Sequence, residues 1–245
     1  MNNFKTIIKK ILFVVFKRFS FLRALVRNVL DTLAKISIQT SKWVGNMYTI
    51  LFDFLGTSWY DHRFDHLRGI DNYHWLERVF FVLPKISEDD SVLDIGCGDG
   101  IYSGVFYSEK AKSVFAIDTS QDSITSAIKH YKRNNVRFLK KNLLTWDVPA
   151  NKYDVVVMFS VIEHLTALDG QKVLPKIKKS LKKGGVFFGS TPIVQKLGVS
   201  NWEHKNEFTS IAEVKTFLMR VFKDVKITES LWNKDRPECY FECKA

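Results

Sequence analysis

The stretch of sequence that decides the fold is Val92-Leu93-Asp94-Ile95-Gly96-Cys97-Gly98-Asp99-Gly100-Ile101-Tyr102. A short apolar strand, predicted at 91–95, runs directly into three glycines, and a helical segment follows them. A glycine-rich turn between a buried strand and a helix lets a ligand approach the backbone and offers it the free amides of a helix N-terminus. The sequence therefore predicts a ligand-binding turn at the carboxyl end of a strand.

The spacing of these glycines narrows the class of ligand. A dinucleotide fingerprint, G-x-G-x-x-G, would need glycine at position 101, where this chain has Ile101. Asp94 stands two residues before Gly96, where its charge would repel a pyrophosphate and would suit a ligand that carries positive charge. The turn is therefore not predicted to bind a dinucleotide.

From residue 91 onward, short β-branched runs alternate with helical segments, which is typical of a parallel sheet. Strands are predicted at 91–95, 113–117, 136–139, 153–158, 186–190, 225–228 and 240–243, and helices at 102–109, 121–133, 168–182 and 211–221. No helix separates the last two strands, so we expect one strand to run antiparallel. The predicted fold class is α/β: a Rossmann-like, seven-stranded, mostly parallel sheet with one antiparallel strand, plus an N-terminal helical extension.

The glycine stretch resembles the first motif of the class I S-adenosylmethionine-dependent methyltransferases of the small-molecule type. The resemblance continues in chain order over about 160 residues. It covers an acid ending the second strand (115–120), the adenine loop after the third (138–143), the fourth strand with its loop (153–165) and the turn into the fifth (181–188). This chain has Asn142 where the family usually has Asp.

The resemblance implies S-adenosylmethionine as the cofactor and S-adenosylhomocysteine as its product. The carboxylate of Asp118 is expected to accept hydrogen bonds from both ribose hydroxyls, and the amide oxygen of Asn142 can accept one from the adenine amino group. The full set of residues expected to bind the cofactor is Asp94, Gly96, Cys97, Gly98, Asp118, Thr119, Asn142, Leu143 and Ser160.

In this family, catalysis depends mainly on positioning the methyl acceptor. The sulfonium methyl group is already activated, so the acceptor needs only to be held in line with it. A hydroxyl or ammonium acceptor must also lose a proton, which calls for a general base. The candidates are His164 and Glu163, just past the fourth strand, and His204, in the loop after the fifth.

These three side chains are also of the types that ligate metals. Their placement resembles that in the small-RNA 3′-terminal 2′-O-methyltransferases, where two Glu and two His hold a divalent metal. That family has a further Glu at the position that Ser160 occupies here. The loss of one carboxylate of four removes charge that a hard cation needs, so we expect no metal.

The net charge of +11 is concentrated near the N-terminus. Residues 1–60 hold nine basic and two acidic residues, a net +7, which leaves only +4 for residues 61–245 and no basic groove for RNA. Apolar residues recur at intervals of three and four from Phe4 to Leu33, with Lys and Arg between them, so an amphipathic helix is predicted. It has two interpretations: contact of residues 1–35 with an anionic membrane surface, or packing on its own domain or a second subunit.

Three regions are predicted: a basic amphipathic helix at 1–40, a helical, aromatic-rich cap at 41–84, and a class I methyltransferase domain at 85–245. The aromatic residues between Trp59 and Trp75 are expected either to close over a ligand or to cap the domain by packing. Three cysteines and no apolar run of 18 residues favour a reducing, cytoplasmic compartment, with peripheral attachment to the inner face of a membrane under the first interpretation.

The sequence thus predicts methyl transfer, with O-methylation expected, to a small-molecule, lipid-linked or glycan-precursor acceptor. Two alternatives stay open. One is an RNA 3′-terminal 2′-O-methyltransferase, and nucleic acid is not the expected partner. The other is a non-catalytic protein with a methyltransferase-like fold, which would predict a damaged cofactor site, whereas Asp94, Gly96, Gly98 and Asp118 are all in place.

Overall fold

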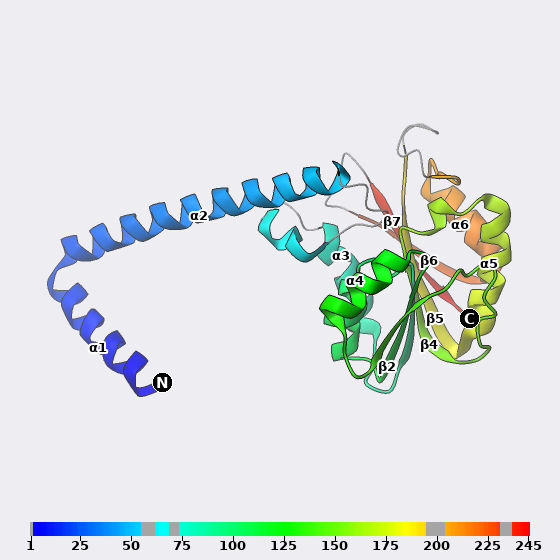
Figure 1. The fold of residues 1–245 in the computed structure, drawn as a ribbon, viewed down its shortest axis with the longest axis horizontal. Helices are drawn as coiled ribbons and strands as arrows, with labels where there is room; N and C mark the ends of the chain where they lie inside the picture. The colour runs from blue at the N-terminus through cyan, green and yellow to red at the C-terminus, as the bar shows by residue number, and fades with distance from the viewer. Residues whose placement is uncertain (1, 55–61, 69–73, 195–203, 231–236) are drawn as a thin grey trace. The chain divides into compact units, whose positions relative to one another are not determined.

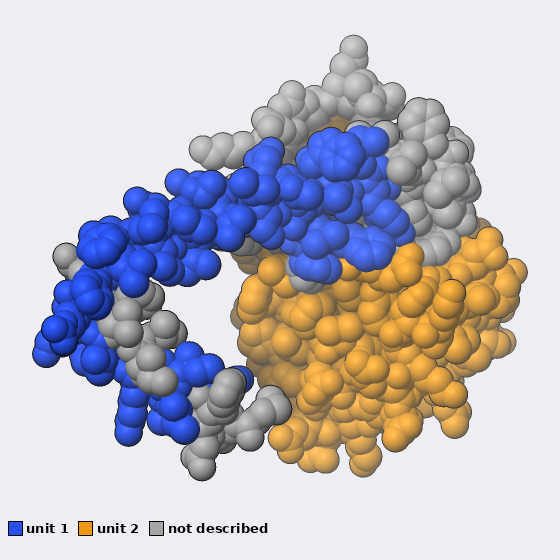
Figure 2. Space-filling model, turned by 60° about the vertical axis from the view of Figure 1, so that its left-hand side comes forward, with its two compact units in different colours: residues 1–54, 64–72 blue, residues 55–63, 73–245 orange. Residues whose placement is uncertain are grey.

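The computed structural model describes residues 2–54, 62–68, 74–194, 204–230 and 237–245 (Figure 1). They fall into two compact units, which Figure 2 colours separately. The first comprises Met1–Phe54 and Phe64–Asn72, and the second comprises Leu55–Arg63 and Tyr73–Ala245. This division differs from the predicted regions, because the first helical part extends past residue 40 and the helix at 74–82 belongs with the sheet.

A seven-stranded sheet forms the centre of the second unit, in the order β3-β2-β1-β4-β5-β7-β6. Its strands are β1 (Ser91–Ile95), β2 (Ser113–Asp118), β3 (Val136–Lys140), β4 (Tyr153–Phe159), β5 (Leu181–Pro192), β6 (Asp224–Glu229) and β7 (Glu238–Lys244). β7 pairs antiparallel with both β5 and β6, while the pairs among β1 to β5 are parallel. The predicted fold class, including its single antiparallel strand, is confirmed.

Helices cover both faces of the sheet, which is why the inner strands are apolar on both sides (Figure 1). One buried cluster joins residues such as Leu93 and Met158 to α5 (Ala167–Ser180) and α6 (Ile211–Met219). The other joins residues such as Val92 and Val157 to α3 (His74–Val82) and α4 (Gln121–Tyr131).

Side-chain caps fix where three of these helices begin. The hydroxyls of Ser120, Thr166 and Ser210 accept hydrogen bonds from the backbone amides of Ser123, Asp169 and Glu213, at the starts of α4, α5 and α6. Such caps satisfy amides that have no partner within the helix. The helix starts predicted at 121, 168 and 211 agree with these within one residue.

Two of the differences between predicted and observed elements have a clear physical reason. Residues 102–109 form a π-helical turn (Tyr102–Phe106) and a 3-10 turn (Tyr107–Glu109) instead of a regular helix. A side chain at Gly104 would meet the backbone oxygen of Tyr131 at 2.4 Å, so this segment packs unusually close to α4. The helix predicted to end at 182 ends at Ser180, because Leu181 already pairs with Tyr153 as the first residue of β5.

The first unit contains two long helices, α1 (Asn2–Arg18) and α2 (Ser20–Phe54), and the short η1 (His62–Arg68) contributes to both units. The amphipathic helix predicted without interruption is therefore divided at Phe19. Within the unit, η1 packs on the end of α2: the rings of Tyr48 and Phe64 lie 4.5 Å apart. Among the described residues, no helix combines the length and the low charge that crossing a membrane requires.

Candidate functional site

The glycine turn after β1 adopts a conformation that side chains disfavour. Gly96, Gly98 and Gly100 have φ values of +73°, +53° and +83°. A Cβ on Gly96 would lie 2.3 Å from Val161 Cγ2, and one on Gly100 would lie 2.6 Å from Ala127 Cβ. A Cβ on Gly98 would meet nothing within 4 Å. The outer glycines are therefore required for packing, whereas the middle one borders open space into which a ligand can reach.

Asp118, the last residue of β2, is held against this turn by backbone amides. Its Oδ2 accepts a hydrogen bond from Gly98 N at 3.0 Å, and its Oδ1 accepts one from Ser120 N at 2.9 Å. Each carboxylate oxygen can accept a second hydrogen bond. Because the side chain is only partly buried, the carboxylate is fixed in position and still accessible to a ligand with two adjacent hydroxyls.

Asp94 and Cys97 support the turn from its buried side. The Asp94 carboxylate is 5% exposed and accepts a hydrogen bond from Ser103 Oγ at 2.6 Å. Burial raises the pKa of Asp94 to about 7, and burial also raises the pKa of the Cys97 thiol. Both residues were expected to bind the cofactor, and the structure places them beneath the backbone that would contact it.

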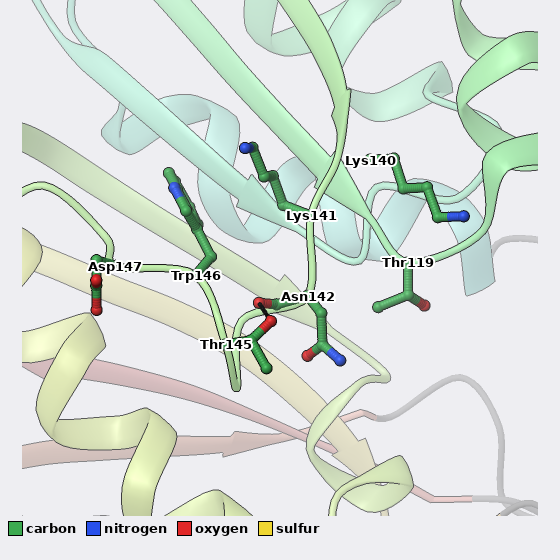
Figure 3. A pocket seen from close by; sticks show the side chains of 7 residues that line it. All are labelled: Thr119, Lys140, Lys141, Asn142, Thr145, Trp146 and Asp147. Carbon is green, nitrogen blue, oxygen red and sulfur yellow. Dashed lines mark hydrogen bonds between the residues drawn. The ribbon is translucent and has the colours of Figure 1, made fainter.

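A cavity of about 640 Å³ opens between the loops that follow β2 and β3. Figure 3 shows the residues that line it: Thr119, Lys140, Lys141, Asn142, Thr145, Trp146 and Asp147. Trp146 stacks on Phe115, with ring centroids 5.8 Å apart. Asn142 Oδ1 accepts a hydrogen bond from Leu144 N at 3.0 Å, which shapes the loop, while Leu143 is buried in the core. Two residues expected to bind the cofactor, Thr119 and Asn142, therefore share one cavity.

The structure brings together all three candidate catalytic residues, Glu163, His164 and His204. One nitrogen or oxygen atom of each lies within 4.8 Å of the others, and the two imidazole rings are nearly perpendicular at 5.1 Å. The carbonyl oxygen of Glu163 accepts hydrogen bonds from Lys205 N at 2.7 Å and Asn206 N at 3.0 Å. These bonds dock the segment that carries His204 against the loop after β4.

The Glu163 side chain has an unusual environment for a carboxyl group. It is 1% exposed, and neither oxygen has a hydrogen-bond partner among the residues that the structure describes. Burial raises its pKa to about 8. Two imidazoles and a carboxylate are also a donor set that fits a divalent cation such as Zn²⁺. The three side chains are therefore suited to moving a proton, and their geometry would also admit a metal ion.

Ser160 takes part in a polar network that the sequence did not reveal. Arg78 Nη2 donates to Ser160 Oγ, and at 2.9 Å to Glu238 Oε1, which also accepts from Ser190 Oγ. The position that holds a fourth metal ligand in the RNA-methylating family is thus bound here to a guanidinium. The sequence held one indication of this network, namely that Arg78 is the single arginine in the largely apolar helix α3.

Part of the aromatic region between Trp59 and Trp75 lies on the glycine turn. His62 N donates to Asp99 Oδ2 at 2.8 Å, and His62 Nδ1 lies 3.2 Å from Asp99 Oδ1. The His62 ring also contacts the edge of Tyr102, with centroids 5.4 Å apart. Residues 55–61 and 69–73 lie outside the described residues, so only part of this aromatic region is described. This contact links the segment before the sheet to the turn.

Comparisons with known proteins find similar methyltransferases. A family model described as a methyltransferase domain matches residues 92–185. The chain is 32% identical over 125 residues to a probable S-adenosylmethionine-dependent methyltransferase of Mycolicibacterium smegmatis (50% of this chain, 46% of that protein). It is 28% identical over 150 residues to a ubiquinone biosynthesis O-methyltransferase of Rickettsia bellii (57% of this chain, 59% of that protein).

A solved structure of an S-adenosylmethionine-dependent methyltransferase from Mesorhizobium loti has the same fold, with a TM-score of 0.57 and 13% identity. The match covers 73% of this chain and 99% of that one. By contrast, the chain covers only 46% and 59% of the length of the two curated relatives named above.

The buried carboxyl of Asp94 predicts a pH-dependent stability. Its folded pKa of about 7 lies above the ordinary 3.8, so the stability it contributes is full below pH 4 and is lost as the pH rises through 7. Asp94→Asn removes this titration and keeps an oxygen for Ser103. Relative to this variant, the wild type should lose up to about 4 kcal/mol of unfolding free energy between pH 4 and 8. Urea unfolding across this range measures the difference, and a constant difference would contradict the assignment.

Proposed function

We propose that the chain is a class I S-adenosylmethionine-dependent methyltransferase, in keeping with the methyltransferase-domain match over residues 92–185, and that it transfers a methyl group from S-adenosylmethionine to a small acceptor. S-adenosylmethionine supplies an activated methyl group on a sulfonium and leaves as S-adenosylhomocysteine. The observation that carries this proposal is the joint geometry of Gly98 and Asp118: open space beside a glycine, next to a carboxylate fixed by the amide of that glycine.

Separate parts of the site suit separate parts of the cofactor. Asp118 would accept from the ribose hydroxyls, and the cavity lined by Thr119, Asn142 and Trp146 would hold the adenine ring. The open backbone beside Gly98 would let the remainder of the molecule approach closely. The negative charge of the accessible Asp118 favours a cationic ligand, which fits a sulfonium better than a pyrophosphate.

Replacement of Asp118 tests the ribose assignment. Asp118→Ala should weaken binding of S-adenosylmethionine by about 2 to 4 kcal/mol, through loss of two charge-assisted hydrogen bonds. Equilibrium dialysis with labelled cofactor measures this change. Asp122→Ala, which removes an exposed acid on the neighbouring helix α4, serves as the control and should leave the affinity unchanged. Wild-type affinity in Asp118→Ala would exclude Asp118 from the ribose site.

We assign proton acceptance to an imidazole of the Glu163, His164 and His204 cluster. Imidazole titrates near neutral pH, which suits a general base acting on a hydroxyl. His164 lies in the turn directly after β4, at the carboxyl edge of the sheet, where the loops of a parallel sheet form ligand sites. His204 contacts it from the loop after β5. These positions support O-methylation, the reaction for which the Rickettsia relative is named.

The acceptor that we propose is a small molecule, a lipid-linked precursor or a glycan precursor. Two observations make RNA a weaker candidate. The second unit is nearly balanced in charge, with only +4 over residues 61–245, and Arg78 bound to Ser160 adds a cation where that chemistry needs a metal ligand. A non-catalytic role is weaker still, because the glycine turn and Asp118 are intact.

Labelling identifies the acceptor class directly. Lipid, small-molecule and RNA fractions of a cell extract are incubated with the protein and radiolabelled S-adenosylmethionine. We expect label in the lipid or small-molecule fraction, and a loss of roughly 10²- to 10⁴-fold in rate for His164→Ala with unchanged cofactor affinity. Label in RNA would favour the first alternative, and cofactor binding without any labelled product would favour the non-catalytic one.

Residues 1–35 are proposed to contact an anionic membrane surface on the inner, cytoplasmic face, mainly through α1. Ile7, Phe13 and Val14 are exposed on this helix, and Lys5, Lys9, Lys10 and Lys17 are exposed beside them. The first acidic residue of the chain is Asp31. Burial of apolar side chains and attraction of lysines to anionic headgroups would act together on such a helix.

Deletion of residues 1–18 tests this contact. The intact protein should sediment with anionic vesicles, less so at high salt because ions screen the lysines, and the truncated protein should stay in the supernatant. Neutral vesicles are the control. Equal sedimentation of intact and truncated protein would rule out α1 as the membrane contact.

A further inference from the structure

Helix α2 carries a seven-residue apolar repeat. Between Leu22 and Met47 its apolar positions recur at alternating intervals of four and three. The positions are Leu22, Val26, Val29, Leu33, Ile36, Thr40, Trp43 and Met47, of which only Thr40 is polar. We name these eight residues the α2 seam. Such spacing is that of the a and d positions of a coiled coil.

From Val29 to Met47 the α2 seam is exposed, although it is the most apolar face of the helix, while Leu22 and Val26 are half-buried. Val29, Leu33, Ile36 and Trp43 are between 50% and 62% exposed. The η1 segment packs on a different side of α2. Arg68 approaches Gly45, whose position in the repeat is directly opposite the seam. Within the described residues, the chain's own packing on the end of α2 therefore leaves the seam uncovered.

The period of the seam indicates what covers it. On a straight helix of 3.6 residues per turn, a strict seven-residue repeat drifts by about 20° per heptad. From Leu22 to Met47 the drift amounts to roughly 70°. A flat membrane surface would lose contact with such a seam along its length. A second helix that supercoils around the first keeps contact throughout.

The charges around the seam indicate a second copy of this chain. Of the eight residues at the flanking e and g positions, only Arg23 is charged; the others are Leu25, Leu30, Thr32, Ser37, Gln39, Val44 and Asn46. The remaining charged residues of the repeat, Arg27, Asp31, Lys35 and Lys42, stand at the outer b, c and f positions. In two parallel copies, Leu25 of one copy would lie beside Leu30 of the other. C-terminal to Arg23, no like charges would face each other across the interface. Beyond Arg23, the flanks offer no charges to recruit an acidic partner.

We propose that α2 pairs with α2 of a second copy in a parallel, two-stranded coiled coil along the α2 seam. The a, d, e and g positions between Leu22 and Met47 give four residues each, or sixteen per copy. This is of the same order as the roughly 20 to 30 residues a side of a standard interface. The pairing does not depend on the proposed catalytic activity, and it would hold two methyltransferase domains on one helical stalk.

Two isoleucines provide a matched test. Ile36 lies in the seam and is 58% exposed, whereas Ile38 lies on the outer face two residues later and is 57% exposed. Light scattering of the full chain in buffer without lipid or detergent should give twice 28.5 kDa for the wild type and for Ile38→Lys. Ile36→Lys should reduce the mass to 28.5 kDa. A monomeric wild type, or equal effects of the two substitutions, would overturn the proposal.

Cross-linking tests the register independently of stability. The native cysteines Cys97, Cys239 and Cys243 are buried, so a cysteine placed on α2 would be the reactive one. Under mild oxidation Ile36→Cys should form a covalent dimer, because d positions of parallel helices face each other, and Ile38→Cys should not. If Ile36→Cys gives no dimer, the proposal fails. It also fails if the wild type is monomeric and binds vesicles while Ile36→Lys does not, because the seam would then contact a membrane.

Discussion

The close packing of the turn between Gly96 and Gly100 is the constraint on which the rest of the second unit depends. A side chain on Gly96 would collide with Val161 in the loop after β4, and one on Gly100 would collide with Ala127 of α4. The same turn is bound at Gly98 by Asp118 from the end of β2. Three neighbouring segments thus converge on a few backbone atoms, and they leave space only beside Gly98. The cofactor site that we propose follows from this packing.

The predictable part of the structure was the part with local signals. Strands β1 and β4 are buried on both faces, so most of their residues are apolar. Asp118 was predicted as the acid that ends the second strand. The predicted end of a helix was wrong where strand pairing overrides helix propensity, as at Leu181, which pairs with Tyr153. Asp94 was expected to face the ligand, but its burial and its bond to Ser103 are tertiary properties that no local pattern carries.

The Arg78, Ser160 and Glu238 network shows why the acceptor side of the site was harder to predict. Its members are separated by 78 to 160 residues along the chain, and they meet only because β7 lies beside β5. Glu163, His164 and His204 were found in advance because each follows a strand at the same edge of the sheet. Their mutual distances and the unpartnered carboxyl of Glu163 required coordinates.

The excess positive charge belongs mainly to the N-terminal helices, and the structure gives those helices two different surfaces. On α1, exposed lysines and apolar residues lie side by side, which suits an anionic membrane. On α2, the outer face carries the charges and the seam is apolar, which suits a second helix. Membrane attachment and self-association can therefore reside in separate helices of the same extension.

We propose that the Gly96–Gly100 turn and Asp118 form a cofactor site. Titration calorimetry of the full chain with S-adenosylhomocysteine tests this site, because this product needs no acceptor and does not turn over. We expect saturable binding at a single site per chain. Absence of heat at high concentrations of folded protein and ligand would show that the site does not bind the cofactor.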